Sequence, residues 1–125
     1  MRTEAQKKNQ SSGERKVSDI LDAAGMTYAV EYVFPDLVAT SGRPLRFDFA
    51  VFDDAGNVWF LIEYQGEQHY QKVGKFNNGK GLQRQQFNDR MKAEYCLDRN
   101  LPLVSIPYVD FHYLDYDYIM QKALL

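Results

Sequence analysis

Cysteine and histidine are scarce in this chain of 125 residues, which has one cysteine, Cys96, and two histidines. A single cysteine excludes an internal disulfide, and the combined set is too small for a structural zinc site of the cysteine–histidine type. Long apolar runs are also lacking, since no stretch approaches the roughly 20 apolar residues that span a bilayer. The polar start, MRTEAQKKNQSSGERK, has no apolar segment of a secretory signal. We therefore expect a cytoplasmic protein without membrane contact.

A strong charge of either sign is missing as well. The formal net charge is −2, which argues against a uniformly basic surface for nucleic acid but leaves room for a local basic patch. With 45% hydrophobic and 26% charged residues, the chain has the composition and size of one globular domain. We expect residues 1–12 to be a disordered tail and residues 13–125 to form a single domain.

The spacing of apolar residues predicts the order helix, strand, β-hairpin, helix, strand, helix. Pro35 is expected to close the first strand, and Asn100 to end the second long helix. The predicted segments are a helix at 12–24, a strand at 28–34, hairpin arms at 45–52 and 58–65, a glycine-rich mobile loop at 69–81, a helix at 82–99, a buried strand at 101–106 with a parallel neighbour, and an amphipathic helix ending the segment 110–125.

The hairpin carries the most informative pair of residues. A turn centred on Ala55 and Gly56 places Asp48 directly opposite Glu63, on one face of the two arms. Like charges across a strand pair repel each other, so this arrangement is costly unless a cation lies between them. A divalent metal ion is the usual cation in such a place.

Four stretches of the sequence resemble one known superfamily of nucleases. They are FDFAVF, LIEYQGEQHY, FNDRMKAEYC and LVSIPY, and the resemblance covers Gly13 to Tyr108. The chain resembles the PD-(D/E)xK, or restriction-endonuclease-like, superfamily, and within it the phage branch related to very-short-patch repair endonucleases and EDxHD homing endonucleases. The resemblance implies an α/β fold: a mixed central sheet of about four strands, flanked by helices, with a β-hairpin that carries the site. It also implies a metal-dependent DNA endonuclease of homing or repair type, encoded by a phage or mobile element and acting in the cytoplasm of a bacterium or an infected host cell.

The resemblance also assigns roles to individual residues. Asp48 corresponds to the metal-binding aspartate and Glu63 to the acidic residue of the motif, while Gln65 stands where the motif has the lysine that orients or activates water. This leaves the identity of the general base open. The EDxHD branch adds a helix glutamate, a histidine and a second aspartate, which here are Glu14, His69 and Asp89.

The chemistry of phosphodiester cleavage explains why such groups are needed. Asp48 and Glu63 could hold Mg²⁺, with Mn²⁺ as a substitute, because magnesium prefers oxygen ligands and keeps several waters. His69 could transfer a proton near neutral pH, and Asp89 could orient it. Simpler roles exist for each: Glu14 as a helix N-terminal acid, Asp89 as an exposed helix residue, His69 as a loop residue and Gln65 as a polar strand end.

A basic stretch follows the hairpin and predicts contact with the DNA backbone. A solvated charged loop is the alternative interpretation of the same stretch. A homodimer or a separate partner that provides specificity is compatible with the chain, and so is a different function, a catalytically inactive nucleic-acid- or protein-binding module on the same fold. The basic residues are Lys72, Lys75, Lys80, Arg84, Arg90 and Lys92.

Overall fold

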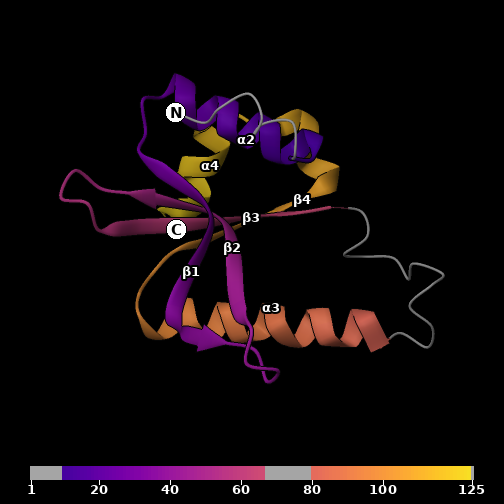
Figure 1. The fold of residues 1–125 in the computed structure, drawn as a ribbon. Coiled ribbons are helices and arrows are strands. Elements are labelled where there is room, and N and C mark those ends of the chain that lie inside the picture. Colours follow the sequence, from indigo (N-terminus) through magenta and orange to yellow (C-terminus); the bar gives the residue numbers. More distant parts are fainter. Residues whose placement is uncertain (1–9, 67–79, 125) are drawn as a thin grey trace.

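The structure is a computed structural model, and it describes residues 10–66 and 80–124. Helices lie on both sides of a central sheet (Figure 1), so the expected mixed α/β class is confirmed. In chain order the elements are α2 (Ser12–Ala23), β1 (Tyr28–Val38), β2 (Pro44–Phe52), β3 (Val58–Gln65), α3 (Lys80–Asp98), β4 (Leu103–Pro107), the 3-10 helix η3 (Tyr108–Tyr113) and α4 (Tyr116–Ala123).

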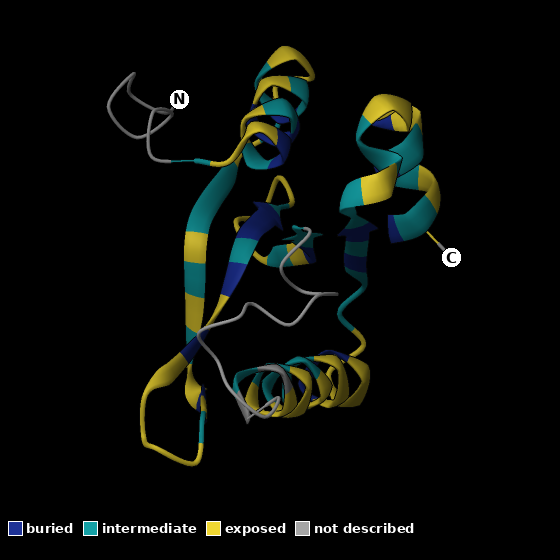
Figure 2. Cartoon of the chain, turned by 90° about the vertical axis from the view of Figure 1, so that its right-hand side faces the viewer, coloured by how far each residue is buried: buried dark blue, intermediate teal, exposed yellow. Residues whose placement is uncertain are grey.

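The sheet has four strands in the order β1-β2-β3-β4. β1 pairs with β2 and β2 pairs with β3 in antiparallel fashion, whereas β4 runs parallel to β3, as expected for a strand that follows a helix. Two apolar cores result. One core joins the sheet to α2 and α4 through residues such as Val17 and Ile119, and the other joins it to α3 through Tyr95 and Cys96. Figure 2 shows that buried residues gather on the strands and on the helix sides that face them.

Sequence signals fix the ends of the two long helices. Ser11 caps α2, since its hydroxyl accepts from the Glu14 backbone N–H while the Glu14 carboxylate accepts from the Ser11 N–H, which completes a capping box. Gly25 follows α2 with a φ of 70°, and Asn100 follows α3 with a φ of 56°. Both residue types tolerate this left-handed conformation, which stops a helix.

The first strand is longer than the sequence predicts. β1 continues through Pro35 to Val38, so the expectation that Pro35 closes the strand is wrong. The reason is position: β1 is an edge strand, where proline removes no ladder hydrogen bond if its nitrogen faces outward. The register between β1 and β2 shifts between Val33 and Val38, around the proline.

The hairpin has the predicted register in its central part. Phe49 pairs with Ile62 and Val51 pairs with Phe60, which agrees with a register that continues to Asp48 and Glu63. Nearer the turn, Phe52 pairs with Val58, so β3 carries one extra residue, Trp59, in a bulge. The turn is therefore centred on Ala55, and not between Ala55 and Gly56 as expected, and the bulge restores the register before the acidic pair.

β2 changes sides at Asp48. Phe47 belongs to the core beneath α3, whereas Phe49 belongs to the core beneath α2 and α4, although residues two apart in a regular strand point the same way. Glu31, opposite Asp48 in the β1–β2 register, has a φ of 49°, which is unusual outside glycine. This kink places Asp48 where the two cores meet.

Candidate active site

Asp48 occupies a partly buried position between β2 and β3. Its carboxylate accepts a hydrogen bond of 2.8 Å from the backbone N–H of Tyr64. This bond crosses to β3 at the point where the ladder between the two strands has ended at Phe49 and Ile62. The kink in β2 and the end of the ladder together turn the Asp48 side chain toward β3.

The surroundings of Asp48 favour its protonated form. Burial, the negative charge of Glu63, that of Glu14 and a hydrogen bond with the Glu63 carboxyl group raise the pKa of Asp48 to about 8, against the lowering effect of the Tyr64 N–H. Two carboxyl groups in contact share a proton more readily than they carry two charges. The facing acidic pair expected from the sequence is thus present, and its electrostatic cost is real.

Glu63 has a cation of its own. The Nζ atom of Lys92, on α3, lies 2.5 Å from Oε1 of Glu63, and both side chains are only 14% exposed. The same Nζ lies 5.5 Å from the centroid of the Phe47 ring. Lys92 therefore belongs to the acidic site itself, where its ammonium group contacts the Glu63 carboxylate near the end of β3.

Glu14 reaches the site from the first turn of α2. Its carboxylate accepts from the Ser11 N–H at 3.1 Å, and its negative charge contributes to the raised pKa of Asp48. The charge of Glu14 thus acts on a residue 34 positions later in the sequence, although among the described residues Glu14, Asp48 and Glu63 do not form a set of three metal ligands.

A cleft of about 510 Å³ opens over the acidic pair. One wall is β2 and the end of β3, and the other is the first half of α3, where spacings of three and four residues put the lining side chains on one helical face. Asp89 lines this wall together with Arg84. The residues that line the cleft are Pro44, Leu45, Arg46, Asp48, Glu63, Tyr64, Gly81, Arg84, Gln85, Asn88, Asp89 and Lys92.

Other predicted site residues lie elsewhere. Gln65 ends β3 opposite Pro107 of β4 and is not among the lining residues of the cleft. Arg90 stacks over the exposed Phe87 ring, 5.9 Å from its centroid, and is likewise not a lining residue. The backbone of Lys80 begins α3, but its side chain is outside the described part of the structure. His69, Lys72 and Lys75 also lie outside the described residues.

Lys92 has a more specific environment than the sequence predicts. The sequence predicted contact with the DNA backbone, and the structure shows that Lys92 packs against Glu63 and Phe47 at the wall of the cleft. A usable signal was present, because Gln85, Asn88, Asp89 and Lys92 follow helical spacing and form one polar face of the helix. The partner on β3 could not be inferred from that spacing.

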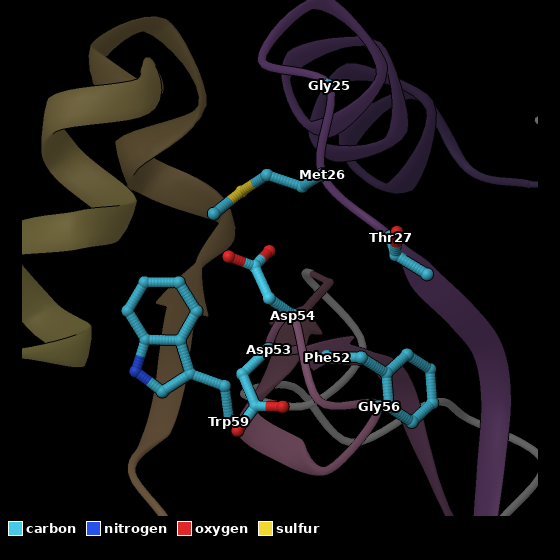
Figure 3. Close-up of a pocket in the computed structure, with 8 residues that line it drawn as sticks. All are labelled: Gly25, Met26, Thr27, Phe52, Asp53, Asp54, Gly56 and Trp59. Carbon is cyan, nitrogen blue, oxygen red and sulfur yellow. The ribbon is translucent and has the colours of Figure 1, made fainter.

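A larger cavity, of about 880 Å³, lies at the other end of the hairpin (Figure 3). Trp59, Met26 and Asp54 surround it, with Asp53 at the turn. The Asp53 carboxylate accepts from the backbone N–H groups of Ala55 and Asn57, both at 2.9 Å, so it stabilises the turn. Among the described residues this cavity has acidic and apolar lining without a basic group, and it does not resemble a site for phosphate.

The oxygen donors decide which metal could be held. In the described residues no group of three histidine, cysteine, aspartate or glutamate side chains has the arrangement of metal ligands. Asp48 and Glu63 nevertheless offer two adjacent carboxylates, and magnesium often binds through one or two carboxylates plus waters and substrate phosphate. The donor set fits such an ion and does not fit zinc.

None of the described helices is long and apolar enough to cross a membrane.

Comparisons with known proteins give one relative without an assigned activity. The chain is 31% identical over 70 residues to a protein of Invertebrate iridescent virus 6 named "Uncharacterized protein 307L". The match covers 55% of this chain and 36% of that protein, so the chain spans about a third of its relative's length. No family model and no solved structure matches the chain.

Proposed function

We propose that this protein is a metal-dependent DNA endonuclease of the restriction-endonuclease-like type, which hydrolyses phosphodiester bonds with Mg²⁺ or Mn²⁺. The observation that carries the proposal is the contact between the Asp48 and Glu63 carboxyl groups at the base of an open cleft. Such a pair raises the pKa of an acid at a cost to stability, and functional sites are where proteins maintain that cost. The four-stranded mixed sheet with helices on both faces is compatible with this fold type.

Each residue of the site has a part in the proposed reaction. Asp48 and Glu63 would hold the metal ion, which supplies charge neutralisation at the phosphoryl oxygens and lowers the pKa of bound water. Hydrolysis adds the hydroxide of water to phosphorus and a proton to the leaving oxygen. Lys92 would take the role of the motif lysine that Gln65 cannot fill, since an ammonium group can orient the attacking water or stabilise a phosphoryl oxygen.

The remaining residues would bind substrate. Arg84 lies on the α3 wall of the cleft and Arg46 on the β2 wall, and both would contact phosphates on either side of the acidic pair. Asp89 shares the α3 wall and could orient a proton-carrying group in the cleft. A homing or repair role and a phage or mobile-element origin are parts of the proposal that the resemblance alone supports, and the proposal is compatible with a homodimer or with a separate partner that provides specificity.

A plasmid assay tests the proposal. Supercoiled DNA is incubated with the purified protein and Mg²⁺ or Mn²⁺, and the Asp48→Asn and Glu63→Gln variants, which keep size and shape, are compared with the native chain. Asp54→Asn is the matched control, because Asp54 is an exposed carboxylate at the opposite end of the hairpin. We expect metal-dependent cleavage that both site variants lose and the control keeps. Equal cleavage by all variants would overturn the assignment.

A second candidate is a catalytically inactive module that binds nucleic acid or protein. The observation that favours it is the Glu63–Lys92 ion pair, because such a pair can stabilise a fold without any reaction. Binding of labelled DNA without metal dependence, together with no cleavage of plasmid, branched or mismatched duplexes, would favour this function over the first.

A further inference from the structure

The first turn of α2 is pressed unusually closely against the end of β3. Gly13 is buried, and a methyl group added at its Cα would overlap the Tyr64 ring. The ring therefore lies directly on the backbone of the helix, in space that only glycine leaves open. Alanine normally favours a helix over glycine by about 1 kcal/mol, so glycine at this helical position is explained by the ring and not by helix preference.

Tyr64 also contacts the acidic site through its main chain. The backbone N–H of Tyr64 donates to the Asp48 carboxylate at 2.8 Å, and Tyr64 directly follows Glu63 in β3. Its ring and its backbone thus touch two different elements that carry acidic site residues. Gly13, which the ring contacts, directly precedes Glu14 in the sequence.

We propose that Tyr64 is a positioning residue for Glu14: its ring, seated on Gly13, fixes the first turn of α2 against β3 and so sets the position of the Glu14 carboxylate relative to Asp48. The inference rests on the proposed function and extends it to how the third carboxylate of the site is placed. The capping box provides the other half of the arrangement, because Ser11 fixes the Glu14 side chain relative to the helix, while Tyr64 fixes the helix relative to the sheet.

The ring, and not the hydroxyl group, carries this role. The atoms that a methyl group at Gly13 would meet are carbons of the ring, and the ring also packs on the core beneath α2 and α4. Tyr64→Phe keeps that surface and is the matched control. Tyr64→Ala removes it, and Gly13→Ala pushes the ring away without changing any polar group.

Affinity for Mn²⁺, measured by calorimetry on the full chain, is the test. In this inference Glu14 would complete the shell of the ion that Asp48 and Glu63 hold, and partners that orient metal ligands typically contribute 10- to 100-fold to metal affinity. We expect Tyr64→Ala and Gly13→Ala to weaken Mn²⁺ binding about tenfold or more, and Tyr64→Phe to stay within about twofold of the native chain. Thermal unfolding of each variant checks that it is folded at the temperature of the binding measurement.

A double-mutant comparison separates positioning from a general loss of structure. If Gly13→Ala acts through Glu14, it should have no further effect on Mn²⁺ affinity once Glu14→Gln is present. An equal loss in both backgrounds, or unchanged affinity in a folded Gly13→Ala variant, would overturn the inference. Absence of Mn²⁺ binding by the native chain would instead overturn the proposed function, so the two failures are distinguishable.

Discussion

Lys92 and Glu63 form an ion pair across the junction of α3 and β3, with 2.5 Å between Nζ and Oε1. Beside this pair, the raised pKa of Asp48 keeps that carboxyl group largely protonated at neutral pH. The acidic site is thereby compensated by one internal cation and one proton. A divalent ion that binds here would displace the proton and share Glu63 with Lys92.

Removing the internal cation tests this arrangement. Lys92→Met should destabilise the protein by about 1.5–3 kcal/mol, because Glu63 keeps its charge in a site that is mostly closed to water. Saturating Mn²⁺ should recover part of the loss, since the metal ion supplies positive charge next to Glu63. Chemical denaturation with and without Mn²⁺ measures both effects.

Glu63→Gln combined with Lys92→Met is the control for this prediction. Without the negative charge the missing cation matters less, so the double variant should be more stable than the sum of the single effects implies. Simple additivity of the two variants would show that the ion pair does not contribute to stability.

Stability should depend on pH through Asp48. Its pKa is raised from 3.8 to about 8 on folding, so the folded state binds the proton more tightly than the unfolded state. The contribution of this group is therefore fully present below about pH 4 and is lost as the pH rises toward 8. Asp48→Asn removes the titrating group while its side-chain amide can still accept from the Tyr64 N–H, so the variant should be the more stable protein at pH 8.

Urea denaturation of both proteins between pH 4 and pH 9 measures this difference. The difference in free energy of unfolding between Asp48→Asn and the native chain should widen with rising pH. Mn²⁺ should narrow this difference, because it should stabilise the native chain only. A difference in free energy of unfolding that stays constant between pH 4 and pH 9 would show that Asp48 titrates below pH 4.

Much of the fold follows from local patterns that act within single elements. The apolar spacing of α2, the aromatic and β-branched runs of β2 and β3 and the asparagine at position 100 each specify structure over a few residues, and each was readable from the sequence. Pro35 was misread because its tolerance depends on β1 being an edge strand. Strand order is a property of the whole sheet, which a local pattern does not contain.

The candidate site, like the fold, has contacts that local spacing predicts and contacts that it does not predict. Asp48 and Glu63 could be paired by counting from the hairpin turn, although that count is right only because the Trp59 bulge offsets the shifted turn. Lys92 could not be paired with Glu63, since 29 residues separate them and the angle at which α3 crosses the sheet sets their contact. The contact of Tyr64 with Gly13 is of the same kind, and no spacing rule predicts it.

Cys96 reports on the packing of α3. It is 2% exposed, and burial, followed by the negative charge of Glu63, raises the pKa of its thiol to about 11 from 9.0. Two pKa units reduce the reactive thiolate roughly 100-fold, in addition to the steric protection. We expect native protein to react with a thiol reagent at least about 100-fold more slowly than urea-unfolded protein at the same pH. Comparable rates would mean that α3 separates readily from the sheet.

Two arginines of α3 allow a matched test of DNA contact. Arg84 lines the cleft, whereas Arg90 lies over Phe87 and is not a lining residue. In the Asp48→Asn background, which prevents cleavage if the proposal holds, Arg84→Ala should weaken binding of a labelled duplex and lower the slope of log affinity against log salt by about 1. Arg90→Ala should change neither quantity appreciably. Fluorescence anisotropy at several salt concentrations measures both, and an equal effect of the two substitutions would show that DNA does not follow the cleft.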